Sequence, residues 1–302
     1  MRRVFVLPLL LLSMVVAFVT PAAAASPTRV ITLPGAHSVE PVAAGTGTTF
    51  YAGDLFHGDI YRGDVRKGTA ELFIQRPGGM AVGLDVDKCH DLLFVAGGGG
   101  TAEVYNTRTR ALVASYKLGD PATSFINDVV TTPFGAWFTD SLQPKLYFVP
   151  TAFGVPGPVR TLNLSGPAAG DPGHFTVNDI AATASGNALF VVPQDLGKLV
   201  RINPFTGASA VVAGVDVPQT DGLVLDGHEL WAVQTFQNKI SRWRLSDDLG
   251  GGTFEKDIVD PQNFRVPLGA AKFGDKLAVA NAHFDTGYPP TNPTYEVLVV
   301  DA

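Results

Sequence analysis

The chain has 302 residues, with 22 basic and 28 acidic side chains and a formal net charge of −6. Such an acidic chain repels phosphate backbones, which excludes nucleic acid as an expected partner. The length allows two ordinary domains or one large all-β domain. Cys89 is the only cysteine, so no intramolecular disulfide can form and core burial must hold the fold together. Because no partner motif accompanies Cys89, we interpret it as a loosely packed thiol rather than a nucleophile or metal ligand.

Residues 1–25 are predicted to be a secretory signal peptide. Arg2 and Arg3 precede an apolar run over residues 4–19, and small residues follow at 22–25. The run is short for a membrane span, and an uncleaved anchor is the alternative. We therefore expect a secreted or periplasmic protein that has no membrane span after cleavage. We also expect residues 26–302 to form one domain and the protein to be a monomer.

The next predicted element is a strand at residues 28–33, followed by a repeat that runs through the rest of the chain. Each copy has a few small apolar residues, a turn with glycine and an aromatic-rich strand, as in residues 127–140. No stretch of 12 or more residues has convincing helical periodicity. The six copies begin at Glu40, Val82, Asn127, Asn178, Asp221 and Leu268. Their spacing of 42 to 51 residues is typical of four-stranded propeller blades, so we predict an all-β, six-bladed β-propeller.

The sixth copy supplies only three strands, the last at residues 297–299. The strand at residues 28–33 has no blade of its own. We predict that it closes the ring as the outer strand of the last blade, which hides strand edges that would otherwise promote aggregation.

The first residues of the six copies are predicted to face the central tunnel, because the innermost strand of each blade lines the axis. Four of them carry oxygen donors and two are apolar: Glu40, Asn127, Asn178 and Asp221, and Val82 and Leu268. Two carboxylates and two amide carbonyls suit a hard cation such as Ca²⁺. The ring has no His or Cys, which argues against zinc, copper and a redox enzyme. Local turn capping is the alternative for the Asn and Asp residues, but it does not explain Glu40.

Four short motifs resemble the segments that begin the inner strands of the blades in one superfamily of propellers. It comprises senescence-marker/gluconolactonase proteins, diisopropylfluorophosphatase, paraoxonases and strictosidine-synthase-like proteins. The motifs are Ser38-Val39-Glu40-Pro41, Phe125-Ile126-Asn127-Asp128, Val177-Asn178-Asp179-Ile180 and Thr220-Asp221-Gly222-Leu223. The resemblance implies a catalytic divalent metal, most often calcium, held by Glu40, Asn127, Asn178 and Asp221. It also makes Asp221 a catalytic general base or nucleophile.

Two departures from this superfamily bear on the substrate. Gluconolactonase-like members have an Arg where this chain has Phe125, so the substrate pocket is expected to favour a more apolar small molecule than a sugar lactone. Paraoxonase-like members use a His pair as a proton relay, and the candidates here are His37, His174 and His283. The resulting hypothesis is an exported hydrolase, dependent on calcium or another divalent cation, that acts on a lactone, ester or phosphotriester. The alternative is a non-catalytic extracellular propeller that binds a ligand or protein at the tunnel face and has a structural metal.

Overall fold

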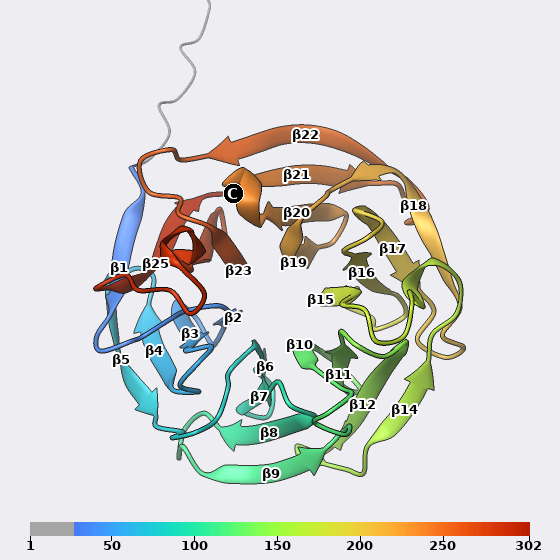
Figure 1. Cartoon of the computed structure of the whole chain (residues 1–302), viewed down its shortest axis with the longest axis horizontal. Helices are drawn as coiled ribbons and strands as arrows, with labels where there is room; N and C mark the ends of the chain where they lie inside the picture. Colours follow the sequence, from blue (N-terminus) through green and yellow to red (C-terminus); the bar gives the residue numbers. More distant parts are fainter. Residues whose placement is uncertain (1–26) are drawn as a thin grey trace, which may run out of the picture.

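The computed structural model describes residues 27–302, so the predicted signal peptide lies outside the described residues. Six antiparallel sheets are arranged around a central axis, and Figure 1 shows them in a view down this axis. The predicted all-β, six-bladed propeller is thus confirmed. None of the helices in residues 27–302 has the length and hydropathy of a bilayer-spanning segment.

The strands of each blade follow one another from the axis outward. Blade 1 has β2 (Val42–Ala44), β3 (Thr49–Gly53), β4 (Ile60–Asp64) and β5 (Thr69–Ile74). Blade 2 has β6 (Gly83–Asp87), β7 (Leu92–Ala96), β8 (Thr101–Asn106) and β9 (Leu112–Lys117). Blade 3 has β10 (Ile126–Thr132), β11 (Gly135–Asp140), β12 (Lys145–Ala152) and β14 (Arg160–Asn163), with the short β13 (Val155–Pro156) also paired to β12.

The other three blades repeat this order. Blade 4 has β15 (Val177–Ala182), β16 (Leu189–Pro193), β17 (Lys198–Ile202) and β18 (Ser209–Asp216). Blade 5 has β19 (Thr220–Asp226), β20 (Glu229–Gln234), β21 (Lys239–Leu245) and β22 (Gly252–Val259). Blade 6 has β23 (Pro267–Phe273), β24 (Lys276–Asn281), β25 (Tyr295–Asp301) and β1 (Arg29–Leu33). Three short 3₁₀ turns lie in loops: η1 (Gly166–Ala168), η2 (Thr235–Gln237) and η3 (Phe284–Thr286).

The core lies between neighbouring blades rather than within one sheet. The second strand of each blade shows this most clearly, because the two neighbouring blades pack against its two faces. All five residues of β7 and all six of β11 are buried, and their sequences are correspondingly almost continuous apolar runs. The outer strands face solvent on one side, and β9 is mostly exposed. This packing fixes the inner strands around the axis.

The ring is closed by strand β1, as the sequence predicts. It pairs antiparallel with β25, from Arg29 opposite Val299 to Leu33 opposite Tyr295. Ile31 and Leu33 are buried in an apolar cluster that also contains Val42 of blade 1. The N-terminal strand therefore belongs to blade 6 and packs against blade 1.

We expect Leu33→Ala to lower the free energy of unfolding by about 2–4 kcal/mol, because it leaves a cavity in this closing cluster. Leu33 is only 2% exposed, whereas Val30 on the same strand is 50% exposed. Val30→Ala is the matched control and should change stability by less than about 0.5 kcal/mol. Urea denaturation measures both values. Equal effects of the two substitutions would contradict the closing role of the buried face of β1.

A β-bulge recurs at the start of four inner strands. The pairing register shifts between Ile126 and Val129 in blade 3, and equivalent shifts occur in blades 4, 5 and 6. A bulge places two residues opposite one and redirects side chains, so consecutive side chains need not alternate between faces. The bulges fall at the residues that the sequence placed at the tunnel.

Candidate functional site

The inner strands of all six blades surround a cavity of about 460 Å³ on the axis of the ring. A cavity of this size can hold a small molecule. Its lining includes Glu40, Asn127, Asn178 and Asp221 together with Val82, so five of the six predicted tunnel-facing residues share one space. The sixth, Leu268, is fully buried beside it, and its neighbours Gly269 and Ala270 contribute to the lining.

Local structure explains why the polar residues occupy equivalent positions. Asn127, Asn178 and Asp221 are each the second residue of an inner strand, inside the bulge. Glu40 differs, because β2 begins only at Val42. Its position is set instead by backbone bonds: its N–H donates to Gly53 O at 3.2 Å, and its carbonyl accepts the Gly269 N–H of blade 6 at 3.1 Å.

The side-chain bonds of the two asparagines reach beyond their own turns. Asn127 Nδ2 donates to Ser141 Oγ at 2.9 Å, and Ser141 Oγ donates to Val177 O of the next blade at 2.7 Å. Asn178 Nδ2 donates to Asp221 Oδ1 of the next blade. Neither bond is a local cap, so the turn-capping alternative is wrong for Asn127 and Asn178. Ser141 engages the amide nitrogen of Asn127, which leaves its carbonyl oxygen as the atom available to a ligand.

In five blades, the residue after the predicted tunnel-facing residue lies where neighbouring blades come close together. In blades 3 and 4 it is an aspartate: Asp128 accepts the Ile180 N–H at 3.1 Å, and Asp179 accepts the Leu223 N–H. In blades 2, 5 and 6 it is a glycine. At Gly83 a Cβ atom would lie 2.5 Å from Asp128 Cα, so only glycine permits so close an approach.

Sequence reasoning missed Asp128 and Asp179 as cavity residues, although both line it. The signal was present in the Asn-Asp pairs. Strict strand alternation would have turned the second member of each pair away from the tunnel, and only the bulge brings both members to the cavity. A third missed carboxylate, Asp85, also lines the cavity and accepts the Thr131 N–H at 2.6 Å across blades 2 and 3.

The cavity concentrates negative charge that is poorly solvated. Burial and then the charges of Asp221 and Asp179 raise the pKa of Glu40 well above its ordinary value. Burial and the charge of Asp179 raise the pKa of Asp221 to about 7, although the hydrogen bond from Asn178 opposes this shift. Burial and the charge of Asp179 likewise raise the pKa of Asp128. Glu40 and Asp221, 181 residues apart in sequence, line the same cavity, and the charge of Asp221 acts on Glu40.

The donor set fits a hard cation. Among residues 27–302, no basic side chain forms an ion pair with Glu40 or Asp221, and no hydrogen bond reaches the Glu40 carboxylate. Glu40 and Asp221 are half-buried, and carboxylates withdrawn from water without a compensating positive charge are costly. A bound divalent cation would remove that cost. Carboxylate and amide oxygens are the ligands that Ca²⁺ takes. For Asn178 to join them, its amide must turn so that oxygen replaces the nitrogen now bonded to Asp221.

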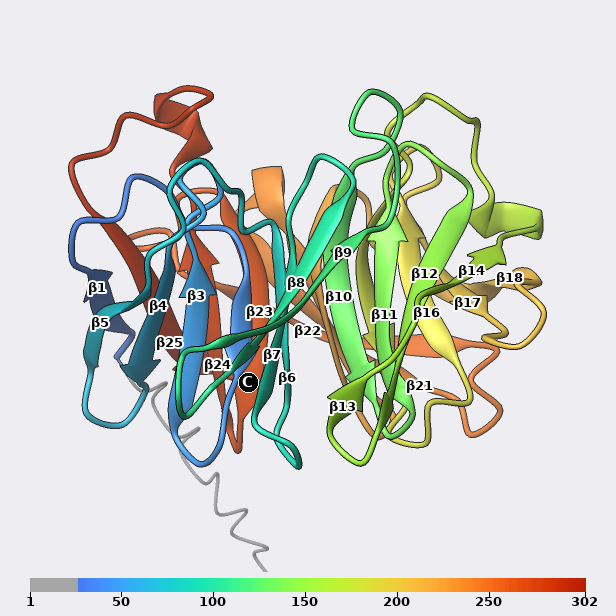
Figure 2. The same ribbon diagram turned by 90° about the horizontal axis from the view of Figure 1, so that it is seen from below.

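Aromatic side chains lie near the ends of the inner strands that carry these donors. Phe125, two residues before Asn127, has its ring 5.8 Å from that of Phe175, three residues before Asn178. On the other side of the ring, Tyr288 contacts Phe56 and Phe284, with ring centroids 5.1 Å apart in both pairs. Burial, and then the charges of Glu40 and Asp221, raise the pKa of Tyr288. Figure 2 shows the η3 loop that precedes Tyr288 projecting beyond the sheets at one end of the ring.

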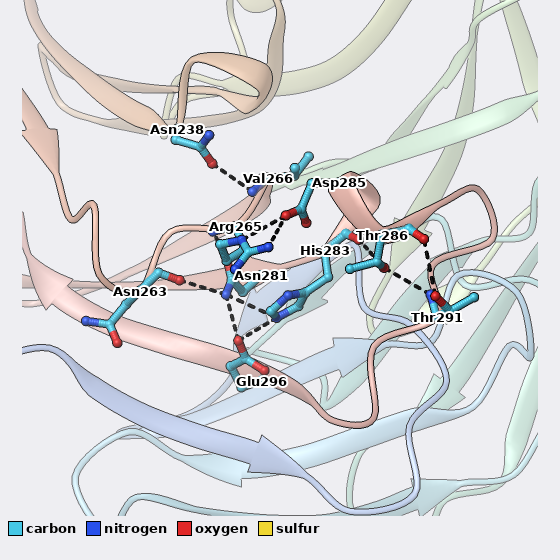
Figure 3. A network of polar contacts seen from close by, with 10 residues as sticks. All are labelled: Asn238, Asn263, Arg265, Val266, Asn281, His283, Asp285, Thr286, Thr291 and Glu296. Atoms are coloured by element: carbon cyan, nitrogen blue, oxygen red, sulfur yellow. Dashed lines mark hydrogen bonds and ion pairs between the residues drawn. The ribbon is translucent and has the colours of Figure 1, made fainter.

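None of the four predicted substrate-pocket residues lines the cavity: Phe125, His37, His174 and His283 all lie outside it. His283 is buried in blade 6, where its Nε2 lies 2.7 Å from Glu296 Oε1 in the network of Figure 3. Asn281 Nδ2 donates to the same oxygen at 2.6 Å, and Asn281 Oδ1 accepts the Arg265 N–H at 2.7 Å. This network anchors both ends of the η3 loop to β24 and β25. His174 is exposed in the loop before β15, and His37 lies beside Asp54 in blade 1.

Comparisons with known proteins support the fold class. No protein-family model matches the sequence, and no curated protein matches it. Among solved structures, the calcium-binding protein regucalcin from Agrobacterium tumefaciens has a TM-score of 0.62 and 17% identity, over 88% of this chain and 92% of that chain. A streptogramin B lyase has a TM-score of 0.61 and 12% identity, over 91% and 97% of the two chains.

The β-propeller domain of Cps50 (Swd1) from Myceliophteria thermophila has a TM-score of 0.58 and 18% identity, over 84% and 82%. At such low identity these neighbours establish the architecture alone. The fold and the cavity define the protein as a six-bladed β-propeller with an acidic, oxygen-lined central site. Its structural neighbours include a regucalcin and a streptogramin B lyase.

Proposed function

We propose that the protein is a calcium-dependent hydrolase whose small-molecule substrates are lactones, aryl esters or phosphotriesters. The observation that carries this proposal is the pair of uncompensated carboxylates, Glu40 and Asp221, which share an axial cavity with two amide side chains. Glu40, Asn127, Asn178 and Asp221 would hold the cation. When bound, a divalent ion polarises a carbonyl or phosphoryl oxygen and stabilises the charge that develops on it.

The chain's own groups would divide the remaining tasks. Asp221 accepts a proton from an attacking water or itself attacks the substrate, and its raised pKa suits a general base near neutral pH. A neighbouring cation lowers that basicity, so the alignment of the attacking group is decisive. Phe125, whose ring lies 5.8 Å from that of Phe175, would favour aryl substrates over sugar acids.

The hydrolase proposal is tested with purified protein on aryl esters, lactones and phosphotriesters, with calcium and with a chelator. We expect chelation to reduce turnover at least about 100-fold, because charge stabilisation of the transition state is lost. Asp221→Asn should reduce turnover by at least as much in the presence of calcium. Asp226→Asn is the control, because Asp226 lines the same cavity but pairs with Lys272 at 2.7 Å, and it should retain activity.

Turnover that is unchanged by chelation would contradict the metal-dependent mechanism. Calcium binding without turnover of any substrate would support the alternative, a ligand-binding propeller with a structural metal. We further propose that the protein is exported as a monomer after removal of residues 1–25. N-terminal sequencing and the molar mass of the exported protein test these two proposals.

A further inference from the structure

Blade 1 contains a buried carboxylate, Asp54, that joins the segment before β2 to the turn after β3. Asp54 is 1% exposed and follows β3 directly. Its Oδ2 accepts the His37 N–H at 2.8 Å, and its Oδ1 accepts the N–H groups of Phe56 and His57 at 3.2 and 3.1 Å. Ser38 Oγ also donates to this carboxylate. Asp54 is therefore held in one orientation and fixes the backbones of both segments beside it.

Each of these segments presents an imidazole to the same carboxylate. His37 Nδ1 lies 3.9 Å from Asp54 Oδ2, and His57 Nδ1 lies 3.6 Å from Asp54 Oδ1. The two rings face each other, with centroids 4.1 Å apart and planes inclined by 30°. One ligand atom from each of the three residues lies within 4.8 Å of the others. Three donors are thus gathered in one place by a carboxylate that already has fixed geometry.

In blade 3, Asp140 occupies the position equivalent to Asp54 and has the same structural role, although no histidines accompany it. Asp140 is the last residue of β11, and it accepts the Phe125 N–H at 3.0 Å and the Leu142 N–H at 3.1 Å. The residues that correspond to His37 and His57 are Phe125 and Gln143. The fold therefore needs the aspartate but not the imidazoles, and the His pair in blade 1 requires a separate explanation.

We propose that His37, Asp54 and His57 form a binding site for a borderline divalent transition-metal ion, with Zn²⁺ as the reference ligand. Two imidazole nitrogens and one carboxylate oxygen are zinc ligands in proteins, at bonds of about 2.0–2.2 Å, and they leave further positions for water. Tetrahedral ligation at such bonds requires donor atoms about 3.3 Å apart. The separations of 3.6 and 3.9 Å run to different oxygens of Asp54, and one ligand atom from each of the three residues lies within 4.8 Å of the others. Rotation of the exposed histidine side chains, 53% and 64% exposed, would bring both nitrogens to about 3.3 Å from one carboxylate oxygen.

This site differs in chemistry from the tunnel site. The tunnel offers only oxygen donors and suits calcium, whereas the His37–Asp54–His57 site offers imidazole nitrogen, which calcium does not favour. The two sites are neighbours along the chain, because His37 lies three residues before Glu40. They are nevertheless independent proposals, because neither shares a ligand with the other.

The test is isothermal titration of the full protein with Zn²⁺ in excess Ca²⁺, which saturates the oxygen-only site. We expect one Zn²⁺ per chain, bound at least about tenfold more weakly by His57→Ala and His37→Ala, since each removes a ligand. Both residues are exposed, so the variants should fold, and unchanged thermal melts of the metal-free proteins would verify this. Their response to calcium alone should equal that of the wild-type protein.

Two controls exclude other sites. His90 lies 2.7 Å from Asp87 next to the exposed Cys89, and His90→Ala and Cys89→Ser should leave the Zn²⁺ affinity unchanged. A Co²⁺-substituted protein should have a visible spectrum without a thiolate-to-metal charge-transfer band. Equal Zn²⁺ affinity in wild type and His57→Ala, or loss of binding in Cys89→Ser, would overturn the proposal.

Discussion

Glu40→Gln is expected to abolish the rise in melting temperature that calcium produces in the wild-type protein. A ligand that binds only the folded state at 100 times its Kd stabilises it by about 2.7 kcal/mol. For a chain of this size that corresponds to a rise of about 5 °C. Glutamine keeps the shape of Glu40 but removes one of the two carboxylates that would balance the charge of the ion. Differential scanning calorimetry with calcium and with chelator measures both effects.

The same substitution separates loss of binding from damage to the fold. In the metal-free protein, Glu40→Gln replaces a carboxyl group whose ionised form is disfavoured by burial and by the charges of Asp221 and Asp179. We therefore expect its melting temperature in chelator to equal or exceed that of the wild type. Asp226→Asn, in the same cavity, should keep the full calcium response because Lys272 compensates Asp226. A calcium response that survives in Glu40→Gln would remove Glu40 from the ligand set.

The sequence was sufficient to predict the ring of blades because a propeller repeats one supersecondary unit. The period located the inner strand of every blade, and the missing fourth strand of blade 6 located β1. The repeat also predicted the tunnel-facing positions, because the first residue of each copy lies at the start of the innermost strand of a blade. Even Glu40, which precedes β2 by two residues, lines the cavity because backbone bonds to Gly53 and Gly269 place it there.

What the sequence did not predict depends on register and on contacts between distant segments. Asp128 and Asp179 reach the cavity only through bulges, and a bulge shifts pairing without requiring a distinctive residue type. His57 meets His37 only because Asp54 joins the segment before β2 to the turn after β3, and no motif spacing records that contact. Period and composition locate elements, whereas such side-chain constellations arise from tertiary hydrogen bonds.

The metal-free protein is expected to lose stability as the pH rises from about 4 to about 7. Burial and the charge of Asp179 raise the pKa of Asp221 from 3.8 to about 7, so between these values the folded state binds a proton that the unfolded state releases. The stabilising contribution is complete below about pH 4 and is lost as the pH rises through about 7. The difference corresponds to about 2–4 kcal/mol, the lower value allowing for water in the cavity.

Urea denaturation in chelator at a series of pH values measures this slope. Asp221→Asn should reduce the slope without removing it, because Glu40 and Asp128 also have raised pKa values, and Asp226→Asn should leave it unchanged. Calcium should reverse the trend in the wild type, because the ion binds the deprotonated carboxylates and its affinity increases as protons leave. Stability in calcium should then rise across the pH range in which the metal-free protein weakens. Parallel profiles with and without calcium would mean that the ion does not bind at Asp221, since protons and calcium would not compete for that carboxylate.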